Sequence, residues 1–382
     1  MTAFSQTSRS FLWGSVVLAT VFSLVLGLLA TSGTAAADPV AAGTAPESES
    51  GRFLVVGGTD SQSLAVMRVN RNGTLTKIRT VRTGLGVMSV KVARGGKLVY
   101  VGHIVEGAVS VYRLTDGGRL NRIQRIAVPG PIMTMQPSRD SRYMYLAMSG
   151  VPGRLDTYRI GASGRLSTTG HSVPMSLGSL APMVTVDPNG RYVRAASAFD
   201  ASIKSYRVAP GGRLVPLGTV FTGGLPAVNG NATPDGRFFY ITHEYTGNVS
   251  GFRVLPNGDL APIPVNFFSG LMSHEVMITP DGERAYVANV GSGGVAGYRI
   301  HRNGAMSPLP GSPYATGFGS APALTVLHPN GRYAYAVDVF TPGRGTTHVH
   351  AFRIRPNGSL VKIGSTDMGL RVVDGPVAQM AG

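Results

Sequence analysis

One unit of an internal repeat occupies residues 187–219, where the chain reads DPNGRYVRAASAFDASIKSYRVAPGGRLVPLGT. An Asn-Gly turn opens the unit, a short strand follows, and a second strand ends in the pair Tyr206-Arg207. Gly212 lies five residues after the arginine, and Leu214 begins another short apolar segment. Asn-Gly turns favour hairpins because both central residues tolerate positive φ. The unit therefore predicts consecutive antiparallel strands.

Seven copies of this unit follow one another at intervals of about 47 residues. The copies are Met67-Arg68 with Gly73, Tyr112-Arg113 with Gly118, Tyr158-Arg159 with Gly164, Tyr206-Arg207 with Gly212, Phe252-Arg253 with Gly258, Tyr298-Arg299 with Gly304, and Phe352-Arg353 with Gly358. Within a unit, Tyr333 to Val337 alternates in the way that is typical of a half-buried strand. Four short strands per unit at this period predict an all-β, seven-bladed β-propeller with four-stranded blades.

Two other architectures fit the pattern less well. A helical solenoid is excluded because no segment after residue 50 keeps a helical period for three turns. A β-sandwich does not explain seven equal units. The repeats begin at Arg52 with the outer strands of one blade, and residues 375–380 match an inner strand. We expect this C-terminal strand to complete that blade and to close the ring, which removes the open sheet edges.

The first 37 residues have the composition of an export signal. Arg9 is their only charged residue, an apolar run extends from Phe11 to Ala30, and an A-x-A pattern ends at Ala37. We therefore expect a signal peptide at residues 1–37, a flexible leader at 38–51 and the propeller at 52–382, in a secreted, extracellular protein. The apolar run is also long enough to span a bilayer. The alternative is an uncleaved anchor that keeps the protein in the cell envelope.

Composition excludes some chemistry and limits the partners. The chain has no cysteine, which excludes disulfides, thiolate catalysis and a lipoprotein anchor. The net charge is +16, or +15 without Arg9, but about 14 of the basic residues occupy two fixed positions of the repeat and are spread around the ring. This distribution argues against a nucleic-acid partner, and polyanion binding is a third functional hypothesis. We expect a monomer with no membrane contact after signal cleavage.

Candidate site residues lie on one face of the ring. In a four-stranded blade, the loop after the first strand of each repeat and the start of the inner strand open on the same face, here called the mouth. One sector of the mouth stands out, because His243-Glu244 and His274-Glu275 occupy equivalent regions of adjacent blades. Acidic residues are scarce in the chain, which has 19, so two of them at the mouth indicate a function.

These residue types suit acid–base chemistry. Neighbouring carboxylates push their pKa values apart, so that one is protonated while the other is ionised. An imidazole beside each carboxylate donates to a carbonyl oxygen or shuttles a proton. The candidate catalytic residues are Glu244, Glu275, His243 and His274. The candidate substrate-binding residues, from other mouth positions, are His103, Asn229 and Asn289.

Structural roles and metal binding are the alternatives for the same residues. His243 would then bond to the backbone, and Glu275 would pair with a nearby arginine. A divalent cation held by the two glutamates and one of the histidines is a further alternative, although no spacing motif supports it. We expect no resident metal or cofactor. The sequence contains no Ser-His-Asp motif, Walker loop or dinucleotide fingerprint.

Residues 229–360 resemble the seven-bladed bacterial lactonase family, which includes 6-phosphogluconolactonases and fungal carboxymuconate-cyclising enzymes. The resemblance of the repeat extends over about 52–382. It is carried by Tyr240 to Glu244, by His274-Glu275-Val276 before the turn Pro280-Asp281-Gly282, and by Tyr286 to Asn289. The resemblance implies that Glu244 and Glu275 are acids of the family's mouth.

The chain also departs from the family pattern in its cations. The family's Pro-Arg-His segment is replaced by Ala227, Val228 and Asn229, a further arginine by Val290, and a Pro-Arg pair by Pro322-Ala323. Such cations hold a phosphate or carboxylate of the substrate. Their loss, together with the predicted export, argues against 6-phosphogluconolactone as the substrate.

Two functions follow from this sequence. The first is a secreted, lactonase-like carboxylic ester hydrolase that opens a neutral lactone or related cyclic ester at the mouth. Glu244 or Glu275 would activate water, and His243 or His274 would polarise the carbonyl group. The second is a non-catalytic propeller that binds a ligand, a glycan or a protein in the cell envelope. The sequence leaves open which of the two applies.

Overall fold

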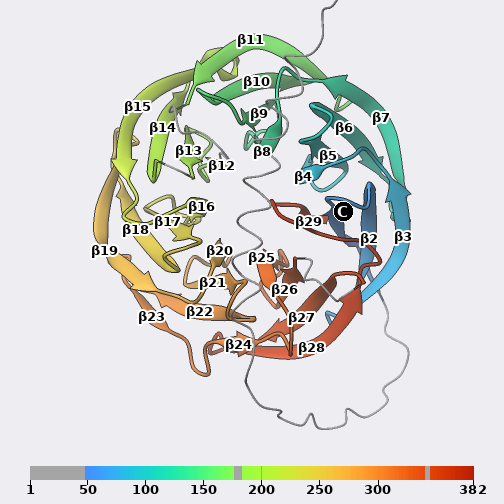
Figure 1. The fold of residues 1–382 in the computed structure, drawn as a ribbon, viewed down its shortest axis with the longest axis vertical. Coiled ribbons are helices and arrows are strands. Elements are labelled where there is room, and N and C mark those ends of the chain that lie inside the picture. The colour runs from blue at the N-terminus through green and yellow to red at the C-terminus, as the bar shows by residue number, and fades with distance from the viewer. Residues whose placement is uncertain (1–47, 176–182, 199, 340–344) are drawn as a thin grey trace, which may run out of the picture. The chain divides into compact units, whose positions relative to one another are not determined.

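The computed structural model describes residues 48–175, 183–198, 200–339 and 345–382. These residues form seven antiparallel sheets arranged as the blades of a ring (Figure 1). Among them the only helical segment is the short 3₁₀ turn Pro210–Gly212, and no helix could cross a membrane. The predicted all-β, seven-bladed propeller with four-stranded blades is confirmed.

The first four blades follow one another along the chain. Blade 1 contains β1 (Ser48–Gly58), β2 (Ser63–Asn70), β3 (Leu75–Arg82) and, as its inner strand, β29 (Ala378–Ala381); blade 2 contains β4 (Val87–Ala93), β5 (Leu98–His103), β6 (Ala108–Leu114) and β7 (Leu120–Ala127). Blade 3 contains β8 (Ile132–Pro137), β9 (Tyr143–Met148), β10 (Arg154–Ile160) and β11 (Leu166–Pro174); blade 4 contains β12 (Met183–Val186), β13 (Tyr192–Ser197), β14 (Ser202–Val208) and β15 (Leu214–Phe221).

The other three blades repeat this order from inside to outside. Blade 5 contains β16 (Ala227–Ala232), β17 (Phe238–His243), β18 (Asn248–Val254) and β19 (Leu260–Phe268); blade 6 contains β20 (Ser273–Ile278), β21 (Arg284–Asn289), β22 (Gly294–Ile300), β23 (Met306–Pro308) and the short β24 (Tyr314–Ala315), which also pairs with β22. Blade 7 contains β25 (Pro322–Leu327), β26 (Tyr333–Asp338), β27 (His348–Ile354) and β28 (Leu360–Asp367).

The C-terminal strand closes the ring, as the sequence predicts. Strand β29 pairs antiparallel with β1, with Phe53 opposite Ala381 and Val56 opposite Ala378. The inner strands contact one another in the cycle β4, β8, β12, β16, β20, β25, β29 and back to β4. Strand β1 already begins at Ser48, so the blade starts slightly before the expected boundary at Arg52.

The strands near the axis are buried on both faces. Tyr333 to Val337 of β26, which the sequence analysis treats as half-buried, lies wholly in the interior. The reason is that each blade packs between two neighbouring blades. The residues on both faces of the strand, large and small alike, are therefore covered by a neighbouring blade. Only the outer strands alternate between buried and exposed residues, as β28 does from Leu360 to Asp367. Half-burial is therefore a property of the blade rim in this fold.

Blades 2, 5, 6 and 7 are each bonded to the next blade through the glycine of the repeat. The Tyr100 hydroxyl of blade 2 donates a hydrogen bond to the Gly164 carbonyl of blade 3 over 2.9 Å. The equivalent bonds are Tyr240 to Gly304 at 2.7 Å, Tyr286 to Gly358 at 2.7 Å and Tyr335 to Gly73 at 3.2 Å. We call this contact the blade clasp. It gives four of the seven repeat glycines a fixed partner on the preceding blade.

The repeat requires glycine at this position for two reasons, which Gly258 of blade 5 illustrates. Gly258 has a φ of +92°, which disfavours residues with a side chain. In addition, a Cβ atom at Gly258 would lie 2.1 Å from Cε1 of Tyr192 on the preceding blade. Gly331, in a turn between two strands of blade 7, has a φ of +69° but no heavy atom within 4 Å of the same position. A side chain at Gly331 would meet backbone strain alone, whereas a side chain at Gly258 would meet the same strain and also collide with the preceding blade.

We predict that Gly258→Ala lowers the free energy of unfolding by about 3 kcal/mol, because the methyl group collides with Tyr192 and the backbone is strained. The matched control Gly331→Ala carries the backbone strain alone and should cost about 1 kcal/mol. Chemical denaturation followed by circular dichroism measures both. If both variants lost the same free energy of unfolding, the contact between Gly258 and Tyr192 would not be the reason that residue 258 is glycine.

Candidate active site

Seven equivalent residues mark the mouth end of the blades. Gly58, His103, Met148, Ser197, His243, Asn289 and Asp338 are each the last residue of the second strand of a blade. Successive side chains of a strand point to opposite faces. His243, which ends β17, and Glu244, which follows it, therefore face different surroundings. This alternation separates two residues that the sequence analysis places in one group.

His243 and His103 lie inside the blades and not beside the other candidates. His243 has no exposed surface, and a Cβ atom at Gly224 would lie 2.6 Å from Cγ of its ring. Burial lowers the pKa of His243 to about 4. His103 is also fully buried, its Nε2 atom lies 3.0 Å from the Ser110 hydroxyl, and burial lowers its pKa to about 4. Both imidazoles are therefore neutral at neutral pH.

A β-bulge brings His274 and Glu275 to the site together. Ser273 pairs with Asn289 and Glu275 pairs with Ala288, so the ladder between β20 and β21 skips His274. A bulge leaves one residue without a partner and turns the strand locally. Both side chains are buried, with exposed fractions of 5% for His274 and 9% for Glu275. The bulge thus places two adjacent ionisable side chains where a regular strand would direct them to opposite faces.

Glu275 also takes part in a set of bonds between inner strands. Its Oε2 atom accepts a hydrogen bond of 2.8 Å from the backbone N–H of Thr325 on blade 7. Ser89 and Thr134 occupy the same position of their blades and accept equivalent bonds, Ser89 from Met135 and Thr134 from Val184. One oxygen of Glu275 therefore has a structural partner of the kind that a hydroxyl provides in other blades.

The connection that closes the ring supplies a third ionisable group. Asp374 lies between β28 of blade 7 and β29 of blade 1, and its Oδ1 atom is 3.0 Å from Nε2 of His274 on blade 6. The backbone N–H of Gly375 donates to the same oxygen over 2.6 Å. The Asp374 side chain is 37% exposed, whereas that of His274 is 6% exposed. The pair thus joins a buried imidazole to a carboxylate in contact with solvent.

Electrostatics keep this pair ionised at neutral pH. Burial opposes the charge on His274, but the hydrogen bond to Asp374 and the negative charges of Asp374, Glu244 and Glu275 outweigh it and raise the pKa of His274 to about 9. Burial likewise opposes the charge on Asp374, and the bond to His274 overcomes it, so the pKa of Asp374 is lowered. His274 is therefore an imidazolium ion at neutral pH.

The two glutamates are shifted in the opposite direction. Burial raises the pKa of Glu244, and the positive charge of His274 only partly opposes this. Burial also raises the pKa of Glu275, against the bond from Thr325 and the charges of Lys91 and His274. Burial lowers the pKa of Lys91, on β4 of blade 2, and the charge of Glu275 opposes this. Lys91, Glu244, His274, Glu275 and Asp374 form what we call the mouth cluster.

The mouth cluster combines a base with a cationic hydrogen-bond donor. Glu244 is half-buried and retains contact with solvent, which suits a carboxylate that takes a proton from water. His274 has one further ring nitrogen, Nδ1, which is buried and has no hydrogen-bond partner among the described residues. An unpaired N–H of an imidazolium in a buried site is costly unless a ligand oxygen accepts it. The arrangement can therefore polarise a carbonyl group beside a base.

The two asparagines differ in what remains available to a ligand. Asn289 accepts a bond of 2.7 Å from the Ser273 hydroxyl and donates to the Val287 carbonyl over 3.3 Å. Asn229 lies on the inner strand β16, next to β20, and its buried Nδ2 atom has no partner within the described chain. Asn229 therefore keeps a donor for a ligand, whereas Asn289 is engaged in holding the mouth loop.

Sequence reasoning missed Lys91 and Asp374. Lys91 stands between Val90 and Val92 in an apolar inner strand, and an isolated charge in such a strand is a usable signal. Asp374 precedes Gly375 and Pro376 in the last connection, where no repeat position marks it. Both lie far along the chain from residues 243–275. Only closure of the ring shows that they belong to the same cluster.

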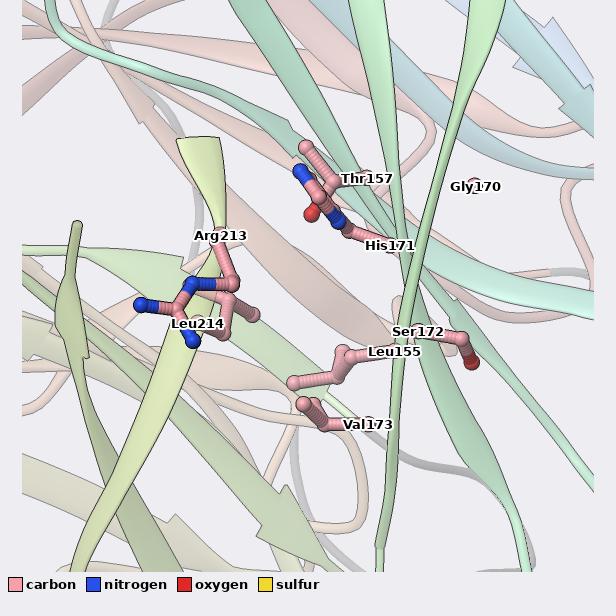
Figure 2. Close-up of a pocket in the computed structure, with 8 residues that line it drawn as sticks. All are labelled: Leu155, Thr157, Gly170, His171, Ser172, Val173, Arg213 and Leu214. Carbon is pink, nitrogen blue, oxygen red and sulfur yellow. The ribbon is translucent and has the colours of Figure 1, made fainter. Parts of the chain in front are cut away.

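Besides the mouth cluster, the described residues include a buried group in blade 7, in which Nε2 of His350 lies 3.0 Å from Oδ2 of Asp338 and 3.0 Å from the Ser320 hydroxyl. The described residues contain no three His, Asp or Glu side chains placed to hold a metal ion. A pocket of about 200 Å³ lies between the outer parts of blades 3 and 4, and its lining includes Thr157, His171 and Arg213 (Figure 2). This pocket is smaller than a typical ligand site. It is a crevice between two blades, away from the inner strands.

Comparisons with known proteins agree with the fold. A sequence model of the family "Lactonase, 7-bladed beta-propeller" matches residues 98–232, roughly a third of the chain. The match ends before Glu244, so it supports the repeat and not the mouth cluster. No protein with a curated description matches the sequence.

Solved structures resemble the propeller at low sequence identity. A putative 6-phosphogluconolactonase from Bacteroides fragilis superposes with a TM-score of 0.71 at 19% identity, covering 87% of this chain and 98% of that one. The periplasmic gluconolactonase of Pseudomonas aeruginosa gives 0.72 at 18% identity, covering 87% and 99%. Kuenenia stuttgartiensis hydrazine synthase gives 0.59 at 18% identity, covering 82% and 99%. These likenesses show the fold alone, and in repeat and architecture the chain resembles the seven-bladed lactonase propellers.

Proposed function

We propose that the protein is a lactonase that hydrolyses a neutral lactone or related cyclic ester at the mouth cluster. The observation that carries the proposal is the arrangement of His274, which has one nitrogen bonded to Asp374 and the other without a partner, beside Glu244. An imidazolium ion next to a carboxylate of raised pKa is the pairing that ester hydrolysis needs. The lactonase-like fold adds support.

In the proposed reaction Glu244 acts as the general base. It takes a proton from a water molecule while the water oxygen attacks the carbonyl carbon of the lactone. The Nδ1–H group of His274 donates a hydrogen bond to the carbonyl oxygen as it becomes negative. The tetrahedral intermediate then collapses, the ring C–O bond breaks, and the leaving oxygen takes the proton from Glu244. Asp374 and Glu275 serve to keep His274 protonated.

The surroundings of the cluster favour a substrate without a phosphate group. The mouth connections, counted with the strand residue at each end, contain seven acidic and three basic residues within the described chain. An anionic substituent would meet repulsion there. Leu225, Tyr245 and Leu271, with exposed fractions of 45%, 56% and 58%, lie on mouth loops in the sector of Glu244 and His274. They offer contact to an apolar part of the substrate.

A non-catalytic ligand-binding protein is the second candidate. The observation that favours it is the bond from Thr325 to Glu275, because serine and threonine fill the same position in two other blades without any charge. Under this hypothesis the charges of the mouth cluster serve affinity alone. Wild-type protein would then bind a lactone, seen as a raised melting temperature, and leave it intact.

We predict measurable turnover of neutral sugar and aliphatic lactones, with a 6-phosphorylated sugar lactone as the poorer substrate. Glu244→Gln should lower kcat at least about a hundredfold because the base is lost. The matched control is Glu106→Gln, which removes an acid from the mouth loop of blade 2. A pH-stat or coupled assay measures the turnover of the purified wild type, of Glu244→Gln and of Glu106→Gln. Absence of turnover by the wild type, or equal rates for both variants, would contradict the proposal.

We also predict a bell-shaped dependence of kcat/KM on pH. Activity should rise as Glu244 ionises, above its ordinary pKa range, and fall near pH 9 as His274 loses its proton. Asp374→Asn removes the main partner of His274 and should move the alkaline limb to lower pH. An alkaline limb that stays in place in Asp374→Asn would show that His274 is not the group that titrates there.

A further inference from the structure

The repeated arginines lie on one face of the ring, opposite the mouth. Consecutive strands of a blade run in opposite directions, so the Pro-Asx-Gly turns and the glycine turns share one edge. We call this edge of the ring the turn face. The arginine of each aromatic-Arg pair is the next-to-last or a nearby residue of its strand, immediately before that edge. The sequence predicts that the positive charge is spread around the ring. The strand order shows that these arginines all lie at one face of the ring.

The turn face is strongly basic. From the arginine of each pair to the residue after its glycine turn, the seven copies contain thirteen basic and two acidic residues. The six turns that follow the inner strands of blades 2 to 7 add eight basic and five acidic residues. Most of these arginines are exposed, among them Arg159, Arg207 and Arg253. The mouth connections, by contrast, have an excess of acids.

Part of this charge also joins the blades. Arg94 of blade 2 donates to the Gly161 carbonyl of blade 3 over 2.7 Å, and Arg139 of blade 3 donates to the Pro188 carbonyl of blade 4 over 2.9 Å. Backbone carbonyls do not neutralise a guanidinium group. The contacts fix the positions of these arginines while leaving their charge unpaired with any acid. The turn face therefore carries a net positive charge that its internal bonds do not cancel.

Two further features of the turn face limit the kind of partner. The exposed large hydrophobic residues of the described chain, such as Val151, Tyr245 and Phe318, lie at the mouth edge. The turn face therefore offers charge without side chains for insertion into an apolar phase. The described chain also begins at the turn face, since Ser48 pairs with Asn70 beside the first glycine turn. In the sequence, the apolar run Phe11–Ala30 precedes this point closely.

We propose that the turn face docks on an anionic phospholipid surface and leaves the mouth open to solvent. Charges distributed over all seven blades match an extended anionic surface better than a single linear polymer, which would contact one stripe of the ring. Each arginine near such a surface adds to the attraction, and salt weakens it. The proposal replaces the expectation of no membrane contact after signal cleavage. It does not depend on the lactonase hypothesis.

The test uses the chain from Asp38 onward, which retains every strand of the closed ring, and vesicles of phosphatidylcholine with or without phosphatidylglycerol. Co-sedimentation should show binding only to the anionic vesicles, and binding should weaken as sodium chloride rises. The variant Arg159→Gln, Arg207→Gln, Arg253→Gln should bind at least about tenfold more weakly. The matched control Arg79→Gln, Arg82→Gln, Arg125→Gln removes the same charge from outer strands and should bind as the wild type does.

Three results would overturn the proposal. The first is equal weakening by the two triple variants, which would make net charge and not the turn face responsible. The second is equal binding to neutral vesicles. The third is binding to a soluble polyanion such as heparin without binding to anionic vesicles, which would assign the turn face to a linear polymer. Circular dichroism of each variant checks that the ring is folded.

Discussion

A tyrosine hydroxyl on one blade bonds to a glycine carbonyl on the next, and this clasp recurs around the ring. The chain has no cysteine, so packing and hydrogen bonds alone must hold seven separate sheets together. The clasp also fixes the distance between blades, because a side chain of the preceding blade, such as Tyr333 at Gly73 or Leu98 at Gly164, occupies the space of the absent Cβ atom. Where the tyrosine is absent, another donor appears: Arg194 reaches the Gly258 carbonyl from blade 4. In blade 3 the Thr157 hydroxyl donates to the Gly212 carbonyl, while the Tyr145 hydroxyl has no partner within the described chain.

The regular outer part of the ring allows the inner part to vary. Ser89, Thr134 and Glu275 occupy one position of their blades and make the same bond to the next inner strand. A carboxylate can replace a hydroxyl there without loss of that bond, and it brings a second oxygen and a charge. The same bulge occurs in the inner strands of blades 2, 3 and 7, where it leaves Met88, Met133 and Ala323 unpaired, and in blade 6 it holds the ionisable side chain of His274. The mouth cluster thus arises from two local changes in a scaffold that stays constant.

The repeat made the fold predictable, because seven equal spacings allow few architectures. Closure by residues 375–380 was predictable from the phase of the repeat, and strand β29 confirms it. The site was predictable only where a residue departs from its equivalents in other blades, as Glu244 and Glu275 do. The position of His243 depends on strand alternation at a loop boundary, and that of His274 on a bulge, which the residue pattern does not encode. Asp374 enters the cluster only because the ring closes.

Asp374 connects the stability of the ring to the chemistry of the mouth. It lies on the connection that leads into β29, the strand that closes the ring, and it is the main reason why His274 holds a proton up to a pKa of about 9. Without Asp374, His274 would retain only the smaller influence of Glu244 and Glu275 against the cost of its burial, and burial lowers the pKa of His243, which has no acidic partner, to about 4. The connection that closes the ring therefore supplies the largest favourable contribution to the charge on His274. Because strands β1 and β29 form one blade, the residue that contributes most to this charge lies on the connection that completes the ring.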